Sequence, residues 1–135
     1  MLATSIRVTQ PRLLKETAQT LRKLGLSISS SSSPSPLSIT PYPSSQSSHF
    51  PGKVGQSHPP IPPLLVPTST YPARNLSLLR KLAASAPGPF FATGKAGQIN
   101  AALFAAACLA PTHPKIRRAL HLFRSRQTKS VPQKP

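Results

Sequence analysis

Residues 27–72 read SISSSSSPSPLSITPYPSSQSSHFPGKVGQSHPPIPPLLVPTSTYP. This stretch has neither helical nor strand periodicity, and its prolines remove backbone hydrogen-bond donors and favour extended polyproline II geometry. We therefore predict that residues 32–72 form a Ser/Pro-rich disordered linker. A ligand for an aromatic-lined groove is an alternative, because Pro59-x-x-Pro62 has the spacing that such grooves recognise.

The composition of the whole chain favours the same interpretation. Its 135 residues include 18 Pro and no Trp, only 5% are aromatic, and the formal net charge is +16. Few large side chains are available to build a core, and uncompensated positive charge opposes a compact state. We predict a mostly intrinsically disordered chain with no independent globular core. Two or three short α-helices are expected at about 11–24, 75–86 and 100–126, the last interrupted at Pro111–Pro114.

The shortage of acidic side chains bears directly on chemistry. Glu16 is the one carboxylate side chain against 17 Lys and Arg. General acid–base, metal-assisted and triad mechanisms usually draw on carboxylates. Cys108 is alone, and the four His show no metal-ligand spacing. We therefore predict a protein that is not an enzyme, with no catalytic residues, cofactor, metal or small-molecule substrate.

Residues 1–31 form a basic, amphipathic segment that is rich in hydroxyl side chains. A helix over 11–24 would place its cations opposite a Leu-rich side, and Gly25 is a plausible helix stop. This make-up is typical of a mitochondrial transit peptide. The predicted targeting face consists of Arg12, Lys15, Arg22 and Lys23.

The end of this segment also carries a pattern of its own. The run Arg22-Lys23-Leu24-Gly25-Leu26-Ser27 resembles the two-step processing pattern of matrix-targeted precursors. That resemblance implies a first cut after Lys23 and a second after Ser31. We expect a mitochondrial protein. The alternatives are a chloroplast, cytoplasmic or nuclear location. Without a targeting role, the helix would lie on a protein or membrane surface.

Residues 73–110 combine a short helix with an Ala-rich apolar patch. The helix over 75–86 has Asn75 as its expected N-cap. The patch, AALFAAACLA at 101–110, is too short for a membrane span, which needs about 20 apolar residues. We expect the patch to pack on a partner or to lie at an interface.

Residues 111–135 form a basic amphipathic helix and tail. Apolar residues recur with helical spacing, and basic residues occupy the other side. The predicted apolar face consists of Ile116, Leu120 and Phe123. The predicted anion or RNA contacts are Lys115, Arg117, Arg118, Arg124 and Arg126.

Together these features predict a small, non-enzymatic basic protein, targeted to an organelle, that binds RNA or a ribonucleoprotein through its C-terminal helix. A membrane-associated interaction peptide that uses residues 101–124 is the first alternative. A translated reading frame with no dedicated function is the second. The expected partners are RNA, an anionic membrane surface, or a protein that orders the short helices.

Overall fold

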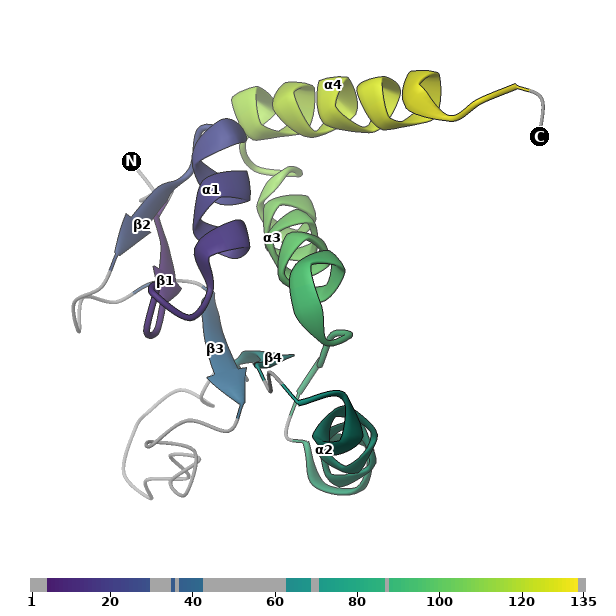
Figure 1. The fold of residues 1–135 in the computed structure, drawn as a ribbon. Coiled ribbons are helices and arrows are strands. Elements are labelled where there is room, and N and C mark those ends of the chain that lie inside the picture. The colour runs from purple at the N-terminus through teal and green to yellow at the C-terminus, as the bar shows by residue number, and fades with distance from the viewer. Residues whose placement is uncertain are drawn as a thin grey trace.

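The computed structural model describes residues 5–29, 35, 37–42, 63–68, 71–86 and 88–133 (Figure 1). In these residues four strands and four helices follow one another along the chain. The strands are β1 (Ser5–Val8), β2 (Ser27–Ser29), β3 (Ser38–Tyr42) and β4 (Leu64–Pro67). The helices are α1 (Lys15–Lys23), α2 (Pro72–Ser85), α3 (Gly94–Leu109) and α4 (Pro114–Ser130).

The strands form one parallel sheet with the order β2-β1-β3-β4. Val8 of β1 is opposite Ile39 of β3, and Ile39 is opposite Leu64 of β4. Beyond β4, Phe90 forms a further parallel bridge with Leu65. A short segment at 89–91 therefore extends the sheet next to β4.

Alternating burial explains why β1 forms a strand. Ile6 and Val8 are buried, whereas the alternating Ser5 and Arg7 are half-buried. This period of two sends the apolar side chains to one face of the sheet. All four residues of β4 are buried, as expected of a strand that is covered on both faces.

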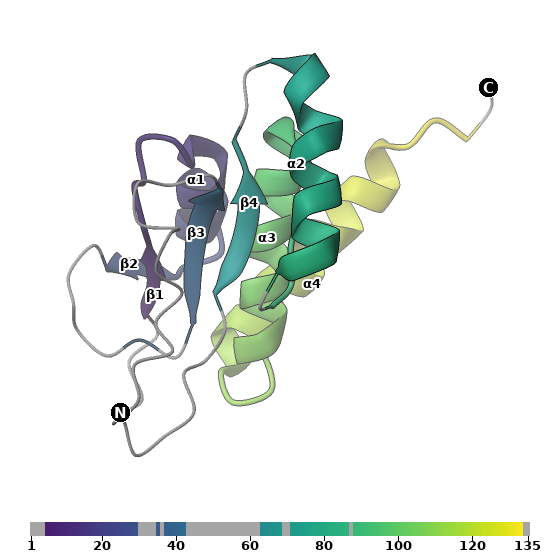
Figure 2. The ribbon, with the colours of Figure 1, turned by 90° about the horizontal axis from the view of Figure 1, so that it is seen from below.

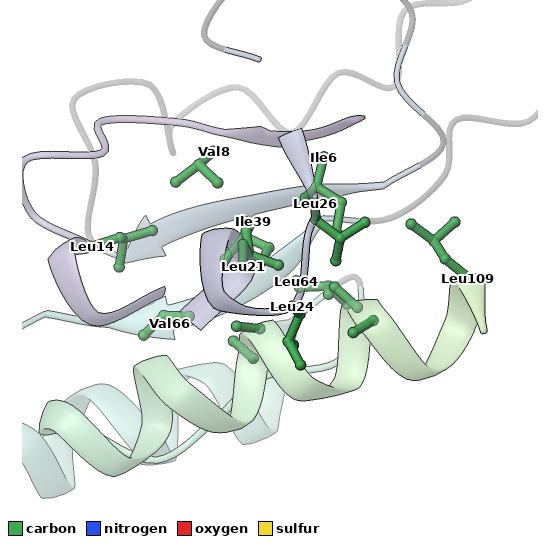
Figure 3. Packing of buried hydrophobic residues seen from close by; sticks show 14 of the residues in the cluster. Ile6, Val8, Leu14, Leu21, Leu24, Leu26, Ile39, Leu64, Val66 and Leu109 are labelled. Atoms are coloured by element: carbon green, nitrogen blue, oxygen red, sulfur yellow. The ribbon is translucent and has the colours of Figure 1, made fainter. Parts of the chain in front are cut away.

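Helices cover both faces of the sheet. α1 and α3 lie side by side on one face, and α2 lies on the other face beside β4 (Figures 1 and 2). The main core lies between the sheet, α1 and α3, and Figure 3 shows its side chains gathered there. Its large members are Ile6, Val8, Leu14, Leu21, Leu24, Leu26, Ile39, Leu64, Val66, Leu109 and Ile116. The fold is thus a layered α/β domain.

The end of α1 is fixed by a glycine. Gly25 has a φ of +78°, which a residue with a Cβ rarely adopts. The Leu26 N–H donates to the Leu21 carbonyl at 3.0 Å, and the Gly25 N–H donates to the Arg22 carbonyl at 3.0 Å. These two bonds form a Schellman motif. They turn the chain directly from α1 into β2.

The prediction of a mostly intrinsically disordered chain without a core is wrong, because the described residues form a folded α/β domain. Small side chains compensate for the missing aromatic ones. The α3 alanines that are fully buried are Ala101, Ala102, Ala105 and Ala106. They let α3 pack closely against α1 and the sheet, so that even a few Leu and Ile make a continuous core.

The expected linker contributes two strands of the sheet. β3 and β4 both lie within 32–72, and Ile39 and Val66 are fully buried. Pro67 is the last residue of β4, and Pro41 lies beyond the part of β3 that pairs with β1. At such positions the missing N–H costs little. The predicted groove ligand at Pro59–Pro62 lies outside the described residues.

The helices differ from the expected ranges at their ends. α1 begins at Lys15 because residues 10–13 form a turn, closed by the Leu13 N–H and the Gln10 carbonyl at 3.0 Å. α2 begins at Pro72, so Asn75 lies inside the helix and not at its N-cap. α3 and α4 together extend the expected 100–126 helix at both ends. The division of the chain into four segments stays a prediction.

Among the described residues, no helix is long and apolar enough to cross a membrane.

Candidate functional site

The carboxyl edge of the sheet is the natural place for a site in this fold. β1 leads through α1 to β2 on one side, whereas β3 leads to β4 on the other side. The order in which strands are added to the sheet therefore reverses between β1 and β3, although all strands run in the same direction. In open parallel sheets, ligands bind outside the carboxyl ends of the strands at such a switch point.

Threonine hydroxyls mark this switch point. Thr9, the residue after β1, has its Oγ1 3.0 Å from the Thr40 Oγ1 of β3. The Thr9 Oγ1 also lies 3.4 Å from the Ile39 carbonyl, to which it can donate. Gln10 follows with a φ of +52°, an uncommon conformation for a residue other than glycine. This tight turn carries the chain from β1 over the edge toward α1.

Two helices begin at the same edge. α1 follows β1, and α3 follows the 89–91 segment, which is parallel to β4. The N-terminus of a helix carries partial positive charge and free N–H groups, so it favours anions. In the described part of the chain, no side chain caps the N-terminus of α3.

Gln98 ties the start of α1 to α3. Its side-chain oxygen accepts the Glu16 N–H at 3.1 Å, and its side-chain nitrogen lies 3.4 Å from the Leu13 carbonyl. The buried Thr17 hydroxyl donates to the Gln98 backbone carbonyl at 2.9 Å. These three contacts hold the two helix N-termini in a fixed arrangement.

Charged side chains surround this edge. Lys95 Nζ at the start of α3 is 3.9 Å from Glu16 Oε2 at the start of α1, and these side chains are 73% and 33% exposed. Such an exposed ion pair contributes little to stability. Arg12 and Lys15 are exposed in the β1–α1 turn and at the start of α1. Among the described residues, the edge thus offers three cations and one carboxylate.

Metal binding has no support in the described part of the chain, where no three His, Cys, Asp or Glu side chains gather. Cys108 is exposed on α3. His113 lies in the α3–α4 turn, where its Nδ1 is 2.8 Å from the Thr112 hydroxyl and 3.1 Å from the Leu109 carbonyl. His113 therefore belongs to the turn and lies away from the carboxyl edge.

The predicted targeting face is divided over two places, the beginning and the end of α1. In the predicted targeting face, Arg12 and Lys15 lie at the carboxyl edge, whereas Arg22 and Lys23 lie in the last turn of α1. All four side chains are exposed. The structure does not test their role in targeting, which stays a prediction.

The predicted apolar face of α4 packs within the molecule. Ile116 and Leu120 are buried, and Phe123 is half-buried against the main core. The five predicted anion contacts on α4, Lys115, Arg117, Arg118, Arg124 and Arg126, are all exposed. The structure places them along α4 and not at the carboxyl edge, and their role stays a prediction.

Sequence reasoning missed Thr9, Thr40, Lys95 and Gln98. The available signal was the β-type alternation of residues 5–8 followed by a turn and a helix. That strand–turn–helix order places Thr9 and Lys15 at one edge once a parallel sheet is recognised. Lys95 and Gln98 had no such signal, because their contacts with α1 are more than 75 residues away in the chain.

Comparison with known proteins shows that this chain is similar to a ribonucleotide mutase and to a purine synthesis protein. It is 35% identical over 89 residues to the N5-carboxyaminoimidazole ribonucleotide mutase of Pseudomonas aeruginosa. The matched region covers 64% of this chain and 55% of that protein. It is 37% identical over 90 residues to the bifunctional purine synthesis protein purC/E of Dictyostelium discoideum. That matched region covers 64% of this chain and 9% of that protein. The chain thus spans about half of the mutase. No family model matches it.

These similarities overturn the predicted function. A non-enzymatic RNA-binding protein is the wrong class, because one relative is named a purine synthesis protein and the other a mutase. The exclusion of a small-molecule substrate is also wrong, since the mutase is named for a ribonucleotide. The membrane peptide over 101–124 is excluded by the buried α3 alanines. A translated reading frame with no dedicated function does not explain the sequence similarity to these two proteins or the folded domain.

Proposed function

We propose that this chain is an enzyme domain of the N5-carboxyaminoimidazole ribonucleotide mutase type and that it binds such a ribonucleotide at the carboxyl edge of its sheet. The observation that carries this proposal is the 35% identity to the mutase over 89 residues. The parallel sheet supports it, because its switch point between β1 and β3 is where ligands bind in open α/β folds.

The charge of the edge suits this ligand. A carboxyaminoimidazole ribonucleotide carries a phosphate and a carboxylate, so it is strongly anionic. Lys15 and Lys95 lie at the first turns of α1 and α3, where the helix dipoles also favour negative charge. The Thr9 and Thr40 hydroxyls add hydrogen-bonding groups beside them. We assign ligand binding to this set of residues.

Glu16 is the carboxylate that this edge offers for proton transfer. It lies in the first turn of α1, with Gln98 fixing its backbone and Lys95 close to its side chain. General acid–base groups must reach the substrate within hydrogen-bonding distance. We therefore propose that Glu16→Gln retains ribonucleotide binding but loses turnover of N5-carboxyaminoimidazole ribonucleotide.

The proposal is tested by calorimetric titration of the full chain with carboxyaminoimidazole ribonucleotide. Lys15→Ala combined with Lys95→Ala should weaken binding by about a hundredfold or more, since hydrogen bonds to charged groups contribute roughly 1.5–3 kcal/mol each. The matched control is Arg80→Ala combined with Lys81→Ala, which removes two exposed cations from α2. Equal losses in both variants, or no binding by a folded chain, would refute the proposal.

Location in mitochondria remains a separate proposal, supported by the basic amphipathic character of the first 31 residues. The described part of this segment forms β1, α1 and β2, which contribute Ile6, Val8 and Leu21 to the core. Cleavage after Ser31 would remove these elements. We therefore propose that import leaves the segment attached.

A further inference from the structure

One exposed side of α4 carries a row of basic side chains around a single leucine. The residues of this stripe follow one another at intervals of three or four, which places them on one side of a helix. The stripe consists of Lys115, Arg118, Leu122, Arg126 and Lys129. All five are exposed, and Leu122 retains 50% of its surface. Ile116 and Leu120, by contrast, are buried in the body of the domain.

The position of α4 makes this stripe accessible. α4 begins beside the end of α3 and extends well beyond the rest of the domain (Figure 1). Beyond Phe123 every side chain of α4 except Ser125 is exposed. The second half of the helix is therefore presented to solvent in an already folded state.

The stripe has no counter-charge within α4. That helix contains no acidic residue, and the one acidic side chain of the chain, Glu16, lies close to Lys95 at the carboxyl edge. Like charges three or four residues apart on a helix repel one another. An external acidic surface would relieve this repulsion. A second copy of this chain would increase it, because its stripe has the same sign.

Leu122 indicates which class of acidic partner fits. It lies between Arg118 and Arg126, so a complementary surface needs an apolar pocket with acidic groups on both sides. A single-stranded nucleic acid would use aromatic side chains for stacking, and the stripe has none. A lipid surface would need a broad free apolar face, but the apolar side of α4 already packs against the core.

We propose that this stripe is a docking site for an acidic protein groove, with Leu122 as its apolar anchor and Lys115, Arg118, Arg126 and Lys129 as its charged rim. The surface is separate from the carboxyl edge, so the proposal is independent of the proposed enzymatic function. It also differs in its partner from the RNA contact expected from the sequence.

A suitable probe is a linked pair of Glu-rich amphipathic helical peptides that present a Leu/Ala groove between acidic rims. Fluorescence anisotropy with the full chain should show saturable binding. Arg118→Glu combined with Arg126→Glu should weaken it by about tenfold or more, and Leu122→Ala by about three- to tenfold. Arg80→Glu combined with Lys81→Glu on α2 changes the charge equally and should alter binding by less than about twofold. Circular dichroism of each variant checks that it is folded.

Three results would overturn the proposal. The first is no binding of the groove peptide by the folded chain. The second is an equal effect of the α2 and α4 charge reversals, or no effect of Leu122→Ala, which would leave only a non-specific basic surface. The third is tighter binding of oligouridylate or phosphatidylserine vesicles than of the peptide, because either would identify a different class of partner.

Discussion

Single residues set the spacing between the elements that carry the candidate site. Gln98 connects α1 and α3 through its side chain and backbone, and Gly97 beside it is buried. A Cβ on Gly97 would overlap the backbone carbonyl of Ala92. Neither relation is visible in the sequence, because each depends on where α3 lies after folding. Gly25, by contrast, could be read as the end of α1 from its place after an amphipathic run.

Gly97→Ala tests this close approach. Alanine normally favours a helix over glycine by about 1 kcal/mol. Here we expect the reverse, a loss of about 1–3 kcal/mol in the free energy of unfolding, because α3 must move away from Ala92. The midpoint of urea unfolding measures the change, and Ala96→Ser on the exposed side of α3 is the control. An unchanged or higher midpoint for Gly97→Ala would mean that α3 does not pack as closely as described.

At the scale of elements, the sequence indicated the helices better than the strands. The Leu-rich and Ala-rich runs have helical spacing that local patterns reveal. β3 and β4 are short apolar pieces between prolines and serines, and only pairing with distant residues makes them strands. Ile39 illustrates this dependence, because its partners are Val8 of β1 and Leu64 of β4. Local composition therefore predicted a linker where the sheet has its centre.

Ala105→Leu tests the packing of α3 against α1 and the sheet. Ala105 is fully buried, so a larger side chain must displace its neighbours. Overpacking of this kind costs typically about 1–3 kcal/mol. Ala96→Leu introduces the same side chain at an exposed position of α3 and should leave stability nearly unchanged. Thermal unfolding followed by circular dichroism compares the two, and equal stability would show that α3 does not form the core.

At the scale of the molecule, composition predicted the charge of the surface but not the presence of a core. The excess of Lys and Arg is found on exposed positions such as Arg12, Lys95 and Arg126. Low aromatic content predicted disorder because it was taken as a lack of apolar area. The buried alanines of α3 supply that area through close packing instead. The acid shortage likewise pointed away from an enzyme, although Glu16 lies at the edge where one carboxylate could act.

The most direct test is a nuclear magnetic resonance titration of the full ¹⁵N-labelled chain with carboxyaminoimidazole ribonucleotide. The account predicts well-dispersed amide resonances, with shifts on titration concentrated at Thr9, Thr40, Lys95 and the first turn of α1. Resonances of α2 and of the second half of α4 should stay in place. A collapsed spectrum typical of a disordered chain would contradict the fold. A dispersed spectrum without changes at the carboxyl edge, or with changes on α4 instead, would contradict the site.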